Sequence, residues 1–251
     1  MPRAHRHFLP SHIWHITHRC HKQEFLLKFA RDRRHWRYWL YQARRRYGLC
    51  VLNYIVTSNH IHLLVRDQGR SEIPRAMQLI AGRVGQAFNQ RKGRKGAFWE
   101  DRYHATAVEA GGHLARCLVY IDLNMVRAGV VSHPAQWEIS GYGEIQSPPD
   151  RYRVIDQAAL LEALGMCSSQ DLKDAHRVWV EDALQSEGRG RDDRWTTALA
   201  VGSESFVERV RQELGVGARK RRVEVVGDLA FVREAPAAYT SQMDWKITPI
   251  R

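Results

Sequence analysis

The sequence is poor in cysteine. It has four cysteines among 251 residues, and Cys20, Cys50, Cys117 and Cys167 lie far apart along the chain, with no C-x-x-C pair. Zinc ribbons and disulfide frameworks need closely spaced or systematically paired cysteines, so neither is expected. Isolated cysteines are typical of reduced thiols, which favours a cytoplasmic protein.

The chain also lacks a long apolar run. Residues 1–7 (MPRAHRH) lead into no apolar stretch of the kind a signal peptide needs. No segment approaches the roughly 20 apolar residues of a membrane-spanning helix, so we expect no membrane partner. Hydrophobic residues make up 44% of the chain and aromatic residues 10%, which is enough for a packed core and excludes global disorder.

Acidic residues are scarce relative to basic ones. The chain has 39 lysines and arginines against 27 acids, which gives a formal charge of +12 and a pI near 9.9. Such an excess favours a polyanionic partner, most simply nucleic acid, although a solvated basic surface has the same composition. It disfavours a metal-dependent hydrolase of small molecules.

Histidine, by contrast, is plentiful, with 13 residues, and one pair has a spacing suited to metal binding. His60 and His62 flank Ile61 within residues 57–65 (TSNHIHLLV). Side chains alternate along a β-strand, so the two imidazoles would share one face, about 7 Å apart along the strand. Two imidazoles placed in this way can bind one divalent ion. Two exposed strand histidines without a ligand fit the same pattern.

Hydrophobic periodicity predicts an α/β arrangement in the first part of the chain. Strands are expected over residues 12–20, 49–56, 60–66 and 103–109, and helices over residues 25–47, 71–90 and 113–126. Gly48 would end the first helix and Ser71 would cap the second. Residues 91–96 (RKGRKG) are expected to form a flexible basic loop that either contacts phosphates or serves as a solvated linker.

The helix expected over residues 113–126 carries a polar face. Tyr120 and Asn124 are four residues apart and so lie one turn from each other, and Arg116 and Arg127 extend the same face. A tyrosine on a helix usually packs into a core. An amide and two arginines beside it argue against burial here.

Residues 147–150 (SPPD) form the clearest break in the chain. Beyond it, helices are expected over residues 156–164, 170–185 and 204–214, followed by a basic run at 218–222. We therefore predict a domain over residues 1–148, a mainly helical extension over 151–235 with no assigned role, and a poorly structured tail over 236–251.

Five segments occur in an order that is specific to one family. They are residues 15–19 (HITHR), 58–65 (SNHIHLLV), 96–103 (GAFWEDRY), 120–129 (YIDLNMVRAG) and 137–142 (WEISGY). Together they resemble the HUH one-tyrosine transposases, most nearly the REP-associated tyrosine transposases of bacteria, over about residues 10–145. The chain departs from this family at Met125, where proline is usual, and at the serines of the last segment. Residues 202–207 resemble the longer family members more loosely.

This resemblance implies a ferredoxin-like α/β (α+β) domain, with an antiparallel sheet and flanking helices, that cleaves and rejoins single-stranded, hairpin-forming DNA. Tyr120 would attack the scissile phosphate and form a 5′-phosphotyrosine. His60, His62 and Asn124 would hold Mg²⁺ or Mn²⁺, with Mn²⁺ the better match to nitrogen ligands. Phosphates would lie on basic side chains, for which the candidates are Arg102, Arg127, Arg91, Lys92, Arg94 and Lys95.

Two alternatives stay open beside a transposase that acts on chromosomal palindromic repeats. One is a mobile-element transposase that moves its own gene. The other is a repeat-DNA-binding protein whose chemistry has decayed, against which the presence of His60, His62, Tyr120 and Asn124 argues. The protein could act as a monomer or a homodimer.

Overall fold

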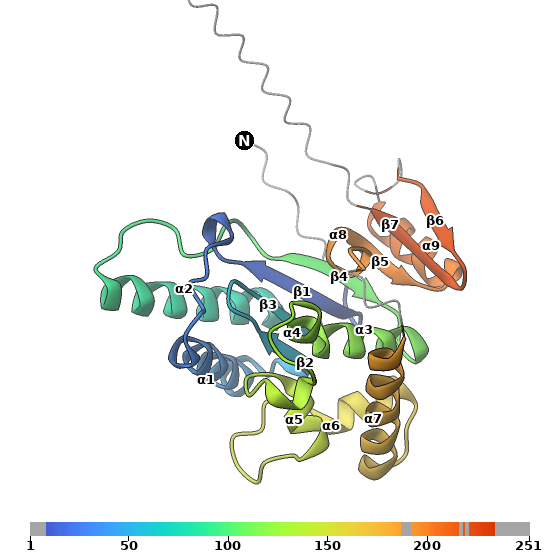
Figure 1. Cartoon of the computed structure of the whole chain (residues 1–251). Coiled ribbons are helices and arrows are strands. Elements are labelled where there is room, and N and C mark those ends of the chain that lie inside the picture. Colours follow the sequence, from blue (N-terminus) through green and yellow to red (C-terminus); the bar gives the residue numbers. More distant parts are fainter. Residues whose placement is uncertain (1–8, 187–191, 216–217, 219–220, 234–251) are drawn as a thin grey trace, which may run out of the picture.

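A seven-stranded sheet with the order β2-β3-β1-β4-β5-β7-β6 organises the protein (Figure 1). The computed structural model describes residues 9–186, 192–215, 218 and 221–233. The strands are β1 (Ile13–Arg19), β2 (Cys50–Val56), β3 (His60–Arg66), β4 (His104–Val108), β5 (Ala198–Gly202), β6 (Val223–Val226) and β7 (Leu229–Arg233). The α-helices are α1 (Ala30–Tyr47), α2 (Glu72–Lys92), α3 (Gly112–Asp122), α4 (Asn124–Arg127), α5 (Gly141–Gln146), α6 (Gln157–Leu164), α7 (Ser169–Gln185), α8 (Arg194–Thr197) and α9 (Glu204–Glu213).

The first four strands form a ferredoxin-like unit. The elements follow one another as β1-α1-β2-β3-α2-β4, and the strands lie in the order β2-β3-β1-β4 with every neighbouring pair antiparallel. Helices α1 and α2 pack against each other on the face opposite to the His60 and His62 side chains. The α/β fold with an antiparallel sheet that the sequence predicts is confirmed.

The strand that carries the histidine pair is held rigidly. Strand β3 spans the predicted residues and pairs with β1 on one side and β2 on the other. Ile61, Leu63 and Val65 are completely buried, so the strand is anchored by its apolar face while His60 and His62 point to the other.

Two helix starts differ from the sequence prediction. Helix α1 begins at Ala30 and not at residue 25, because the preceding residues bond to a distant turn: the backbone N–H of Leu27 donates to the carbonyl of Ser58 at 2.9 Å. Ser71 does not cap α2; it has a left-handed φ of 55° and makes no side-chain capping bond. The Glu72 carboxylate instead accepts from the backbone N–H groups of the turn before the helix, with that of Gln68 at 2.6 Å.

Two predicted segments are divided differently in the structure. Arg91 and Lys92 belong to the last turn of α2, so the basic loop is shorter than predicted. The helix predicted over residues 113–126 is interrupted at Leu123, whose ψ of 4° separates α3 from α4. Tyr120 is therefore in the last turn of α3, and Asn124 begins the next helical turn.

The region beyond residue 150 contains the three predicted helices, α6, α7 and α9, and also three strands that the sequence analysis missed. Strand β5 pairs in parallel with β4, opposite Ala107 and Val108, and β7 and β6 continue the sheet beyond it. The tail predicted over residues 236–251 lies outside the described residues, as does part of the basic run at 218–222.

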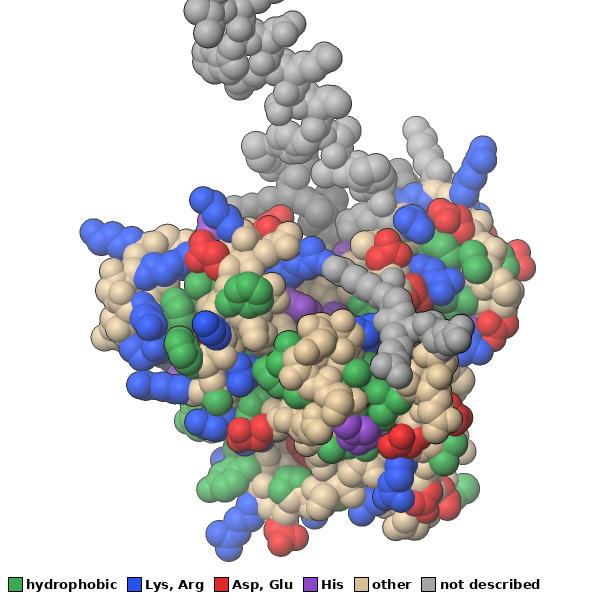
Figure 2. Space-filling view, viewed as in Figure 1, with side chains coloured by type: hydrophobic (Ala, Val, Ile, Leu, Met, Phe, Trp, Pro, Cys, Tyr) green, Lys and Arg blue, Asp and Glu red, His purple; other side chains and the backbone are tan. Residues whose placement is uncertain are grey.

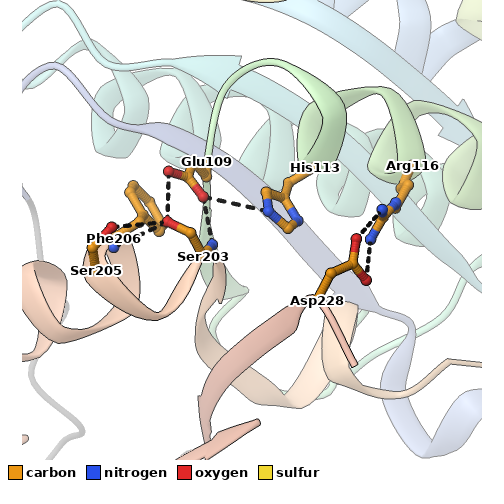
Figure 3. Close-up of polar contacts among 7 residues, drawn as sticks. All are labelled: Glu109, His113, Arg116, Ser203, Ser205, Phe206 and Asp228. Atoms are coloured by element: carbon orange, nitrogen blue, oxygen red, sulfur yellow. Dashed lines mark hydrogen bonds and ion pairs between the residues drawn. The ribbon is translucent and has the colours of Figure 1, made fainter. Parts of the chain in front are cut away.

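Polar contacts connect the region beyond residue 150 to the turn between β4 and α3 (Figure 3). The Glu109 carboxylate, directly after β4, accepts from the hydroxyl of Ser203 at 2.9 Å and lies 3.5 Å from His113. One turn further along α3, Arg116 forms an ion pair with Asp228 between β6 and β7. Among the described residues, no helix is long and apolar enough to cross a membrane.

Candidate functional site

The two histidines of β3 face the same side of the sheet, as their spacing predicts. Their ring centroids are 4.9 Å apart with an interplanar angle of 80°. His62 is buried and His60 is half-buried. In the register, His62 lies opposite Thr17 of β1, and His60 lies opposite Arg19 at the end of the strand pair.

The turn before β3 orients the ring of His60. Its Nδ1 lies 2.7 Å from the amide oxygen of Asn59 and 3.0 Å from the hydroxyl of Thr57. The amide oxygen can only accept, so Nδ1 carries the hydrogen and the lone pair of the neutral ring is on Nε2.

Two neighbours hold His62. Its Nδ1 lies 2.8 Å from Nε2 of His15 on β1, and its Nε2 lies 2.8 Å from the amide nitrogen of Asn124. The other ring nitrogen of His15, Nδ1, lies 2.8 Å from the backbone carbonyl of Trp195 in α8. Complete burial lowers the pKa of His15 to about 3, so this ring is neutral near pH 7.

Tyr120 approaches the same site from α3. Its ring centroid is 5.8 Å from that of His62 and 5.9 Å from that of His15. The guanidinium of Arg127 lies 4.4 Å from the centre of the tyrosine ring and donates to the Tyr120 backbone carbonyl. The side chain is buried, with 7% exposure, so the prediction of an unburied polar face is wrong at this residue. The side chain is buried because α8 packs over the site, where the ring centroid of Trp195 lies 6.2 Å from that of Tyr120.

The side chains of His60, His62 and Asn124 are the candidates to hold a divalent ion. In both imidazoles Nδ1 is engaged in a hydrogen bond, which is the arrangement that directs Nε2 to a metal. The Asn124 amide already meets Nε2 of His62, and turning this amide over would present its oxygen in place of its nitrogen. Among the described residues, no group of three or more His, Cys, Asp and Glu side chains is placed to hold a metal, so any ion here would depend on the amide as well.

The predicted DNA-contacting residues fall into two places. Arg127 contacts Tyr120 itself. The other five lie on the last turn of α2 and the segment after it: Arg91 forms an ion pair with Asp32, Arg94 with Glu24 at 3.5 Å, Lys92 lies over Phe29, and Lys95 and Arg102 are exposed.

These five residues lie near His60, the first residue of β3. The segment that contains Glu24 also bonds to the turn before His60, where the Asn59 amide donates to the carbonyl of Gln23 at 3.3 Å. Figure 2 shows Lys and Arg side chains gathered over α1 and α2, with histidine side chains visible at the centre of the same face.

A groove next to Tyr120 adds a second feature of the site. It has a volume of about 620 Å³ and runs between α3 and α7, with Tyr120 and Arg127 on its wall. Apolar side chains such as Val119 and Trp179 line most of it. A groove of this composition, open beside a candidate nucleophile, is suited to holding a planar apolar group.

Sequence reasoning missed two of the groups that build the site. His15 receives no role from the sequence, although its position in the family-like segment at residues 15–19 is a signal. Trp195 lies in the region beyond residue 150 and contributes a backbone carbonyl, which a pattern of side chains does not predict.

Residues 9–124 match the family model described as IS200-like transposases. Among solved structures, the chain is similar to a REP-associated tyrosine transposase bound to a REP hairpin, with 18% identity, a TM-score of 0.48, and coverage of 57% of this chain and 84% of that one. It is also similar to a chain from Deinococcus radiodurans provisionally described as a transposase, with 12% identity, a TM-score of 0.34, and coverage of 51% and 97%. No match is found among curated proteins. Residues 9–124, which include both histidines of β3, Tyr120 and Asn124, are therefore similar to the IS200-like transposases.

Proposed function

We propose that this protein is a metal-dependent endonuclease and transposase that cleaves and rejoins single-stranded, hairpin-forming DNA through a 5′-phosphotyrosine intermediate. The observation that carries the proposal is the meeting of four groups from three elements. Asn124 lies 2.8 Å from His62, whose ring is 5.8 Å from that of Tyr120, and Arg127 covers the tyrosine ring. With His60, whose ring is 4.9 Å from that of His62, they supply the nucleophile, two imidazoles, amide and cation that such a strand transfer needs.

In this proposal the phenol oxygen of Tyr120 attacks the scissile phosphorus. The phenol loses its proton, a bond forms between phosphorus and the tyrosine oxygen, and the bond from phosphorus to the 3′ oxygen breaks. The 3′ oxygen takes up a proton and leaves as the hydroxyl of one fragment, while the phosphate stays attached to the 5′ end of the other fragment of the same strand. One phosphate ester replaces another, so the reverse reaction rejoins DNA without a nucleotide energy source.

His60, His62 and Asn124 would hold Mg²⁺ or Mn²⁺ beside the tyrosine. A divalent ion there would polarise the phosphate and stabilise the charge that develops on it. The Arg127 guanidinium, already stacked on the tyrosine ring, would add positive charge at the same point.

The choice of substrate rests on charge and on the similarity of residues 9–124 to the IS200-like transposases. The formal charge of +12 favours a polyanion. Arg91, Lys92, Arg94, Lys95 and Arg102 lie on the last turn of α2 and the segment after it, and would bind backbone phosphates. The preference for hairpins of palindromic repeats, and action in the bacterial cytoplasm, follow from the family-like segments.

The experiment that tests this proposal looks for the covalent intermediate. A labelled single-stranded hairpin is incubated with the protein and Mg²⁺ or Mn²⁺ and then separated by denaturing electrophoresis. Wild type is expected to give a protein–DNA adduct. Tyr120→Phe, which removes only the hydroxyl, is expected to bind the hairpin and form none. Tyr103→Phe is the matched control, because Tyr103 is also buried, with 8% exposure, and it is expected to form the adduct.

Each other outcome has a definite meaning. An adduct with Tyr120→Phe would assign the attack to another residue. Cleavage without an adduct in wild type would make water the nucleophile. Hairpin binding without cleavage or adduct in wild type would indicate a DNA-binding protein whose chemistry has decayed.

A further inference from the structure

The region beyond residue 150 reaches into the site through one backbone group. The carbonyl of Trp195 in α8 lies 2.8 Å from Nδ1 of His15, which is 180 positions away in sequence. The hydroxyl of Thr106 on β4 lies 2.7 Å from the carbonyl of Ala198 and 3.2 Å from that of Trp195, so its one hydrogen is directed mainly to Ala198. The carbonyl of Trp195 therefore has a polar neighbour on each of the strands β1 and β4.

This contact fixes the direction of the hydrogen bonds that follow it. A carbonyl only accepts, so Nδ1 of His15 carries the hydrogen and Nε2 of this neutral ring is an acceptor. The hydrogen between the two rings then belongs to His62, whose Nδ1 lies 2.8 Å away. His62 in turn has its lone pair on Nε2, which faces the amide nitrogen of Asn124 at 2.8 Å.

We propose that His15 is a positioning residue that, together with the carbonyl of Trp195, fixes the tautomer of His62 and presents its Nε2 lone pair to the ion beside Asn124. The inference rests on the proposed function for the identity of the ion. The tautomer itself is a property of the protein without metal.

Burial of the two rings disfavours the other tautomer of His62. His15 is completely buried and His62 is 2% exposed, and the two rings are nearly parallel, with centroids 5.0 Å apart. In the other tautomer of His62, two lone pairs would face each other between the rings, with little water to relieve them. An outer partner that sets the tautomer of a ligating histidine is a common means of increasing its affinity for metal.

The proposal also gives the extension a role in the site. The family match ends at residue 124, yet the last acceptor in this chain of hydrogen bonds comes from residue 195. The added region would set the orientation of a ligand without itself supplying one.

The test reads the tautomer directly by long-range ¹H–¹⁵N correlation spectra of the histidine rings in the full-length chain without metal. Comparison with His62→Gln identifies the signals of His62. Wild type is expected to show a hydrogen on Nδ1 and none on Nε2. His15→Phe removes the acceptor and is expected to give a mixture of tautomers. His15→Gln, whose side-chain oxygen can accept from His62, is expected to restore the single tautomer.

Two further variants keep the test decisive. His104→Phe is the matched control, because His104 is also bonded to a carbonyl beyond residue 150, that of Ala198, and to the hydroxyl of Thr106. It is expected to leave His62 unchanged. His15→Leu takes the place of His15→Phe if circular dichroism shows that the phenylalanine variant does not fold.

Titration with Mn²⁺ separates this inference from the proposed function. His15→Phe is expected to weaken Mn²⁺ binding about 10–100-fold, as is usual when an outer partner of a ligand is lost, and His15→Gln is expected to recover most of it. A hydrogen on Nε2 of His62 in wild type, or an unchanged tautomer in both His15→Phe and His15→Leu, overturns the inference. If the tautomers behave as expected but wild type binds no Mn²⁺, the inference holds and the proposed metal site fails.

Discussion

The histidines of β3 present two imidazoles to one point, with ring centroids 4.9 Å apart. We expect the double variant His60→Ala/His62→Ala to lose measurable Mn²⁺ binding in a calorimetric titration, because the amide of Asn124 alone is a weak ligand. His133→Ala is the control, since this histidine lies elsewhere, 3.3 Å from Glu181. Equal affinity in wild type and the double variant would contradict a metal role for the pair.

The cysteines give a second expectation at this scale. Cys20, Cys50 and Cys117 are buried, and burial raises the pKa of Cys20 to about 12 and that of Cys50 to about 11. Cys117, fully enclosed, has its pKa raised as well. Cys167 is exposed. Because the thiolate is the reactive form, a thiol reagent is expected to modify Cys167 alone in the native protein and all four cysteines in denaturant. Rapid modification of Cys167→Ser would show that a second thiol is accessible.

Residue by residue, the sequence assigned roles to the groups that spacing and motif single out and none to the groups that support them. His60, His62, Tyr120 and Asn124 could be placed from spacing and motif. The turn that holds His60 is local, so its polar residues were visible beside it. The partner of His62 could not be found, because His15 reaches it only after the strands pair.

Helix α3 is anchored at its end by a buried polar network. The Asp122 carboxylate accepts from the amide of Asn53 at 3.0 Å and from Nε2 of His176 in α7 at 2.8 Å. The Gln146 amide lies 2.9 Å from the other nitrogen of His176, which leaves Nε2 to carry the hydrogen. The two partners of this carboxylate, Asn53 and His176, therefore meet it only through tertiary packing, and Asp122 is two residues from Tyr120.

Loss of His176 is expected to destabilise the protein. His176→Ala leaves a buried carboxylate oxygen without its donor, which costs about 3 kcal/mol in the free energy of unfolding. Arg177→Ala on the same helix is the control, since its side chain is 58% exposed and the change is expected to cost less than about 0.5 kcal/mol. Urea unfolding of both variants measures the difference. A loss below 1 kcal/mol for His176→Ala would show that water replaces the histidine.

Strand β5 ends at a glycine for steric reasons. A Cβ atom on Gly202 would lie 2.6 Å from a ring carbon of Phe206 and 2.7 Å from Cβ of Glu109, so Gly202→Ala is expected to cost about 2 kcal/mol through overpacking. Gly143 in α5 has nothing within 4 Å of the same position, and Gly143→Ala is expected to be neutral or stabilising by up to about 1 kcal/mol. Thermal unfolding compares the two. Equal effects would mean that Phe206 or Glu109 moves aside easily.

At the scale of elements, long periodic segments were predicted well and short ones were not. Helices α6, α7 and α9 have apolar stripes, and their bounds lie within a residue or two of the prediction. Strand β5 is buried along its whole length, with sequence ALAVG, so it lacks the alternation that marks a strand with one solvent face. Its partners β6 and β7 are four and five residues long.

For the whole molecule, residues 147–150 mark a break in composition, yet strands from both sides of this break belong to one sheet. Strand β5 joins the edge of β4, which would otherwise be exposed, and Asp228 pairs with Arg116 of α3. Composition locates such a break because proline and serine favour turns. It does not show whether later residues return to the same core, since that depends on pairing between distant strands.

A domain over residues 1–148 stays a prediction, and truncation tests it. We expect a chain of residues 1–150 to unfold cooperatively, because the ferredoxin-like sheet and α1 to α5 lie within it, but at a lower temperature than the full chain. The truncated chain loses β5 from the edge of β4, the Trp195 acceptor of His15 and the His176 donor to Asp122.

The variant Asp122→Asn, made in both chains, isolates the effect of losing the His176 donor. In the full chain it replaces the carboxylate that accepts from His176 and is expected to cost about 1–3 kcal/mol, whereas in the truncated chain the donor is already gone and the cost is expected to be much smaller. Thermal unfolding followed by circular dichroism measures the stability of all four proteins. A truncated chain without a cooperative transition would show that the extension completes the core, and an equal cost of Asp122→Asn in both chains would show that His176 does not anchor the helix of Tyr120.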